Sequence, residues 1–121
     1  MTTIKLSALA SVLALLPTVA SAQDSVTEFR MALNPGSIQG CMTLDSSMTR
    51  VHTLTIKDGD ASIKSAGGIN DKLKMVRPKV YEDTFQLGGA RLDIVADLAA
   101  TPKSLTITNR DLGCKWTATA P

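Results

Sequence analysis

From about residue 50 to the C-terminus, apolar and polar residues alternate along most of the chain. A period of two predicts strands with one buried and one solvated face. The clearest unit surrounds Asp58-Gly59, a dipeptide typical of the type I′ turn of a two-residue hairpin. The facing pairs are then Lys57 and Asp60, Ile56 and Ala61, and Leu54 and Ile63. All four apolar residues of these pairs fall on one side, so turn chemistry and alternation predict the same hairpin.

Three more alternating segments, 91–98, 104–108 and 114–120, predict strands, and residues 109–113 have the composition of a turn. The residues expected to face the core are Leu92, Ile94, Ala96, Leu98, Leu105, Ile107, Cys114, Trp116, Ala118 and Ala120. The only tryptophan therefore shares an inward face with a cysteine.

Two segments leave alternatives open. In residues 26–33, Ser25 and Glu28 have the spacing of a helix capping box, whereas the apolar residues alternate as in a strand. Residues 66–90 are bracketed by glycine pairs and interrupted by Pro78, which predicts two short strands or an irregular edge. The basic residues of this segment are interpreted as a solvated strand edge.

Cys41 is out of phase with its apolar neighbours, which predicts a bulge at Gly40 or a strand that begins at Cys41. We find no internal repeat and no linker after residue 22. The pattern as a whole predicts an all-β fold, a small antiparallel sandwich or partly open barrel of about seven strands with one disulfide.

The first 22 residues have the order of features of a secretory signal peptide. Lys5 precedes an apolar run over residues 6–16, which is too short to cross a bilayer. Ala20 and Ala22 are the small residues expected before a cleavage site, and Gln23 would begin the mature chain as a single domain, 23–121. The sequence therefore predicts a secreted or periplasmic protein with no membrane anchor after cleavage.

Removal of Lys5 leaves the mature chain with a net charge of +1 and no block of like charges, which argues against a nucleic-acid partner. An exported domain with two cysteines most often pairs them, so we expect a Cys41–Cys114 disulfide. Such a bridge would destabilise the unfolded state by about 4 kcal/mol on a chain-entropy model. Structural zinc sites usually have four Cys or His ligands at close spacing, and this chain has only two cysteines and one histidine. We therefore expect no structural zinc and no cofactor.

The sequence offers little catalytic chemistry. His52 is the only candidate base for a nucleophile, and its parity places it on the same face as Leu54 and Ile56, where histidines are usually buried and hydrogen-bonded. Asp93 and Asp97 share a strand face but would lie roughly 13 Å apart, too far for a glycosidase pair. No Gly-rich phosphate loop is present.

Threonines repeat on outward strand positions and form a candidate binding face. These residues are Thr53, Thr55, Thr106, Thr108, Thr117 and Thr119. Threonine suits exposed strand positions, although a flat array of this kind could also order water and bind ice.

These observations predict a non-enzymatic exported β-domain that binds a protein or a small ligand, neither of which the sequence identifies. The alternative is an inhibitor of a secreted hydrolase, a lysozyme or a protease, acting through an exposed loop at 66–70 or 88–90. A small hydrolase that uses His52 is a further alternative.

The export prediction is tested by mass spectrometry of the secreted protein. We expect a 99-residue chain that begins at Gln23, with a mass two hydrogens below that of the dithiol form. Another N-terminus, or two thiols free to alkylate without reduction, would contradict it.

Overall fold

The computed structural model describes residues 23–34 and 41–121, which form nine strands and one short helix. The predicted signal peptide and Gly40 lie outside the described residues. The elements are β1 Ser25–Arg30, β2 Ala32–Leu33, α1 Met42–Met48, β3 Val51–Lys57, β4 Asp60–Ser65, β5 Asn70–Arg77, β6 Val80–Leu87, β7 Ala90–Asp97, β8 Lys103–Asn109 and β9 Cys114–Ala120.

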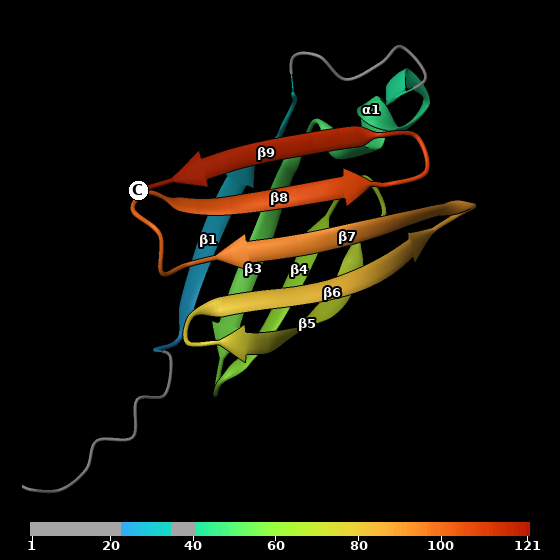
Figure 1. The fold of residues 1–121 in the computed structure, drawn as a ribbon. Helices are drawn as coiled ribbons and strands as arrows, with labels where there is room; N and C mark the ends of the chain where they lie inside the picture. Colours follow the sequence, from blue (N-terminus) through green and yellow to red (C-terminus); the bar gives the residue numbers. More distant parts are fainter. Residues whose placement is uncertain (1–22, 35–40) are drawn as a thin grey trace, which may run out of the picture.

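The strands form an antiparallel, nearly closed barrel in the order β1-β3-β4-β5-β6-β7-β8-β9-β2. Figure 1 shows that β6 to β9 run across the front of the molecule, while β1, β3 and β4 cross behind them at a steep angle. We call these two layers the front sheet and the back sheet. The fold is thus the all-β, partly open barrel expected, with nine strands instead of about seven.

Two segments belong to both layers and make the corners of the barrel, as in orthogonal packing of sheets. Along the first corner, β1 pairs with β3 of the back sheet and β2 pairs with β9 of the front sheet. At the second corner, residues 70–73 of β5 pair with β4, and residues 74–77 pair with β6. Each half of β5 thus has one partner strand, and the basic side chains of this segment are exposed, as expected for a solvated strand edge.

The interior is filled by one cluster of apolar side chains from both layers. The largest fully buried ones are Trp116, Tyr81, Phe29, Met31, Met48, Leu54, Ile56, Ile63, Ile69, Leu92, Ile94 and Leu105. The expected β3–β4 register is confirmed pair by pair. Asp58 and Gly59 have φ of 52° and 86°, the positive values that a type I′ turn requires.

The structure resolves the open alternatives. Residues 25–30 and 32–33 are strands, and alternation buries Phe29 and Met31. The capping-box spacing of Ser25 and Glu28 therefore lies in a strand and not at the start of a helix. Residues 66–90 hold two strands of eight residues each, with Pro78 in the turn between them. Pro78 is tolerated because a turn residue needs no ladder hydrogen bond.

The prediction of a strand that begins at Cys41 is wrong, because helix α1 follows this residue. Cys41 and Met48 are fully buried and Leu44 is partly buried, a spacing of three and four residues that puts one helix face against the core. The phase error at Cys41 was thus the sign of a helix. The Cys41–Cys114 disulfide is formed, with 5.6 Å between the two Cα atoms.

Helix α1 covers one end of the barrel, which we call the helix end. Trp116 Nε1 donates a hydrogen bond of 3.0 Å to Asp45 Oδ1, and the disulfide joins the residue before the helix to the start of β9. The β4–β5 turn packs against the same helix, because a Cβ on Gly67 would lie 2.1 Å from the carbonyl oxygen of Ser47. The opposite end, which we call the open end, holds the β3–β4 and β5–β6 turns and the β7–β8 loop (Figure 1).

Two glycine substitutions test the packing of the β4–β5 turn on α1. Gly67→Ala is expected to lower the unfolding free energy by about 1–3 kcal/mol, the usual cost of overpacking, because the carbonyl of Ser47 belongs to the helix backbone. Gly89→Ala is the matched control, since nothing lies within 4 Å of its added Cβ. Urea denaturation measures both. Equal stability of the two variants would show that the turn does not pack on α1.

Candidate functional site

A cleft of about 290 Å³ lies at the open end of the barrel. It combines an apolar floor with two cationic side chains and takes its lining from both layers. The lining residues are Gln23, Ser25, Ile56, Lys79, Tyr81, Leu98 and Lys103. Ligand sites of β-barrels commonly lie in such mouths and combine apolar walls with a few polar groups.

Local hydrogen bonds hold the segments around the cleft. Leu98 N donates to Lys79 O at 2.8 Å, which joins the end of β7 to the β5–β6 turn. Asp97 Oδ1 accepts hydrogen bonds of 3.0 Å from the amides of Ala99 and Ala100, so this carboxylate orders the β7–β8 loop. The cleft is therefore built on strand ends and tied loops, which suits a preformed site.

Lys79 occupies an unusual backbone position. It follows Pro78 and has φ of 63°. Proline followed by a residue with positive φ is the pattern of a type II turn, in which glycine or asparagine is preferred at the second place. Lysine there is strained, and strain of this kind gathers at functional sites.

Tyr81, one of the residues that line the cleft, carries a polar atom without a hydrogen-bond partner among the described residues. It faces inward from β6 opposite Ala96 and is 1% exposed. Its hydroxyl is buried and has no hydrogen-bond partner among the described residues. A buried hydroxyl without a partner destabilises the fold by about 1–3 kcal/mol, so a donor or acceptor brought by a ligand would be stabilised there.

His52 lies at the other end of the barrel, on the inward face with Leu54 and Ile56 as its parity predicts. It is fully buried, and its Nε2 is 2.9 Å from the carbonyl oxygen of Met48. Burial lowers the pKa of His52, while the Met48 carbonyl raises it. The Nδ1 of His52 has no partner among the described residues. The histidine on which the hydrolase alternative depends is thus fully buried in this structure.

A pair of carboxylates that the sequence pattern did not predict, Asp71 and Asp83, lies on the interior faces of β5 and β6. Their register partners, Ile63 and Ile94, are buried. Burial, a hydrogen bond to Asp83 and its negative charge raise the pKa of Asp71 to about 6. Asp71 Oδ2 is buried and has no hydrogen-bond partner among the described residues. A hydrogen bond between the two carboxyls requires that one of them be protonated, since an ionised carboxylate only accepts. The register of inward positions across adjacent strands is the signal that could have revealed this pair.

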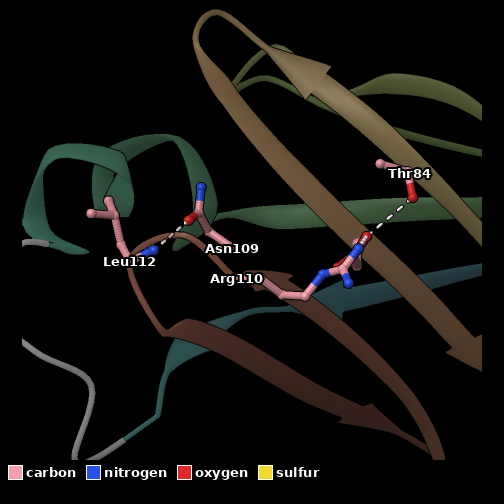
Figure 2. Close-up of polar contacts among 5 residues, drawn as sticks. Thr84, Asn109, Arg110 and Leu112 are labelled. Carbon is pink, nitrogen blue, oxygen red and sulfur yellow. Dashed lines mark hydrogen bonds and ion pairs between the residues drawn. The ribbon is translucent and has the colours of Figure 1, made fainter.

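Asp93 and Asp97 are each engaged in structure. Asp93 accepts hydrogen bonds from Thr84 and Arg110 and pairs with Arg110 Nε at 2.5 Å. Figure 2 shows Thr84 of β6 and Arg110, which follows β8, on either side of the carboxylate of Asp93 that both contact. Asp97 orders the β7–β8 loop as described above.

The six candidate threonines lie on two separate surfaces. Thr53 and Thr55 lie on the outer face of β3, where they line a shallow hollow of about 510 Å³ together with Lys64. The other four lie on the outer faces of β8 and β9, where Thr106 is directly opposite Thr117 and Lys115 is opposite Thr108. The structure thus brings four of the six together, and a lysine interrupts their array.

The two loops considered for an inhibitor differ in exposure. Residues 66–70 pack against the helix end, since Gly67 contacts α1 and Ile69 is 1% exposed. Gly88 and Gly89 form the tip of the β6–β7 hairpin, where added Cβ atoms would meet nothing within 4 Å. Figure 1 shows this hairpin extending beyond the rest of the barrel.

Within residues 23–34 and 41–121, no group of three or more His, Cys, Asp and Glu side chains could hold a metal ion. No helix in the described part of the chain is long and apolar enough to cross a membrane. The disulfide is compatible with an oxidising extracellular or periplasmic location.

The chain matches no protein-family model, and comparisons with curated proteins and with solved structures find no similar protein. The site must therefore be argued from its own geometry.

The carboxylate pair generates a pH prediction. Asp71 has a folded-state pKa of about 6, above the ordinary value of 3.8, so its contribution to stability is complete below pH 3.8 and is lost as the pH rises to 6. Asp71→Asn should be more stable than the wild type at pH 7, by about 1 kcal/mol once solvent screening of this partly exposed pair is allowed for. At pH 3.5 the gain should shrink.

Thermal melts at pH 3.5, 5 and 7 measure the stability of the variant and of the wild type. The difference between the two at each pH cancels the contribution of His52, which changes with pH in the opposite direction. Asp111→Asn, an exposed aspartate in the β8–β9 turn, is the control. A gain that does not change with pH would contradict the raised pKa of Asp71.

Proposed function

We propose that this chain is an exported, non-enzymatic binding protein whose small-molecule site is the cleft at the open end of the barrel. The observation that carries the proposal is the buried, unpartnered hydroxyl of Tyr81 in the lining of that cleft. A fold tolerates such a group where a bound molecule satisfies it, and the strained backbone of Lys79 at the same rim supports the same reading.

The remainder of the described structure fits a binding role. The interior of the barrel is filled by side chains, so a ligand has to occupy a surface cleft. The floor of the cleft is made of Ile56, Tyr81 and Leu98, which belong to three different strands or strand ends. A floor with this origin is rigid, and rigid sites bind without a large cost of ordering.

A screen of small neutral fragments by NMR, recorded on uniformly labelled oxidised protein, tests the proposal. Fragments that bind should shift the amide signals of Ile56, Tyr81 and Leu98 together. Ser25→Trp, which adds an indole at the rim, should weaken these fragments at least fivefold, whereas Ser104→Trp on the outer face of the front sheet should not. Fragments that bind only elsewhere, or equal weakening by both variants, would overturn the cleft as the site.

The second candidate function is inhibition of a secreted hydrolase through the β6–β7 hairpin. The specific observation in its favour is the free, extended tip at Gly88 and Gly89. Immobilised protein should then retain a lysozyme or a protease, and Gly89→Glu should abolish retention without changing the melting temperature. Retention of no hydrolase, or retention unchanged by Gly89→Glu, would count against this candidate.

A further inference from the structure

We infer that the ligand of the open-end cleft is a small anionic amphiphile, a carboxylate or phosphate group on a short apolar body. This inference rests on the proposed function and adds the chemical class of the ligand. It follows from three properties of the cleft, namely the charge of its lining, its unpaired donor and its size.

The charged side chains that line the cleft are both cationic, Lys79 and Lys103. Two carboxylates that directly adjoin lining residues in the sequence, Asp97 and Asp24, accept backbone amides. Asp97 accepts two loop amides, and Asp24 Oδ1 accepts the amide of Asp58 at 2.8 Å. An anion at this rim would therefore meet two cations and no carboxylate of the lining.

The hydroxyl of the lining residue Tyr81 has the same preference. A phenolic hydroxyl can donate a hydrogen bond, and hydrogen bonds to an ionised acceptor are about twice as strong as those between neutral groups. On the inward face of the sheet, Tyr81 has Ala96 opposite and Asp83 two residues along β6, while Ile56 and Leu98 share the lining of the cleft. A carboxylate or phosphate oxygen would accept this bond while the apolar body of the ligand contacts Ile56 and Leu98.

The volume of about 290 Å³ limits the ligand to a small molecule, since typical drug-sized ligands fill sites of roughly 300–1,000 Å³. Removal of the predicted signal peptide after Ala22 would also leave the α-amino group of Gln23 at the rim. An α-amino group has a pKa of about 7.7–8.0 and would add positive charge to the site at neutral pH.

The test uses the mature, oxidised chain and four probes that share one tail: octanoate, octyl phosphate, octan-1-ol and octylammonium. NMR titration should show octanoate or octyl phosphate binding at least fivefold more tightly than the alcohol, with shifts at Tyr81, Leu98 and Lys103. The ratio between the two anions distinguishes a carboxylate ligand from a phosphate ligand. Octylammonium should bind most weakly.

Variants separate the roles of the side chains. Lys103→Met should weaken octanoate about twofold to fivefold, as expected for a screened ion pair, and leave octan-1-ol unchanged, while Lys115→Met at the helix end is the control. Tyr81→Phe should weaken octanoate about tenfold without lowering the melting temperature, because it removes a hydroxyl that has no partner. Lys79→Gly should raise the melting temperature and weaken octanoate, so that stability and affinity move in opposite directions.

Octan-1-ol or octylammonium binding in the cleft as tightly as octanoate would overturn the anionic class and leave the proposed binding function standing. Octanoate affinity unchanged by Tyr81→Phe would show that water satisfies the hydroxyl, and would also overturn the inference. If no probe shifts the cleft signals, the anionic ligand is wrong, and the neutral fragment screen decides separately whether the cleft binds anything.

Discussion

The attachment of α1 to β9 is the constraint on which the rest of this barrel depends. Two orthogonal layers share only their corner strands, and the helix end would expose the indole of Trp116 and the side chains beneath it without a cover. The disulfide at Cys114 and the hydrogen bond from Trp116 to Asp45 attach α1 to β9 at two positions. The hydrogen bonds from Thr49 and Trp116 lower the pKa of Asp45, because both donors favour the ionised carboxylate.

Because α1 covers only the helix end, the two ends of the barrel differ in structure. At the helix end, buried groups such as His52 and Met48 contact each other, and turns pack on the helix. At the open end, no helix among residues 23–34 and 41–121 covers the core, and the strand ends, with Tyr81 between them, line the cleft. The proposed site thus lies at the end of the barrel that α1 does not cover.

Much of this fold is readable from sequence because the alternation of apolar residues in β3, β4 and β7 to β9 is strict and local. Register across a two-residue turn follows directly from Asp58-Gly59. The helix was missed because seven residues that include threonine, aspartate and serine have weak helix propensity, and its spacing at Cys41, Leu44 and Met48 is short. The cleft could not be predicted because its residues come from five separated segments. Their meeting depends on the two corners, where β5 and residues 25–33 change layers.

The central claim is that the buried hydroxyl of Tyr81 is satisfied by a bound molecule at the open end. A high-resolution crystal structure of the protein purified from its secreting cells, without added ligand, tests this most directly. The account predicts density for a small molecule in the cleft, with an acidic oxygen within hydrogen-bond distance of Tyr81 Oη and near Lys79 or Lys103. A cleft that holds only water, with a ligand bound at another surface, would contradict it.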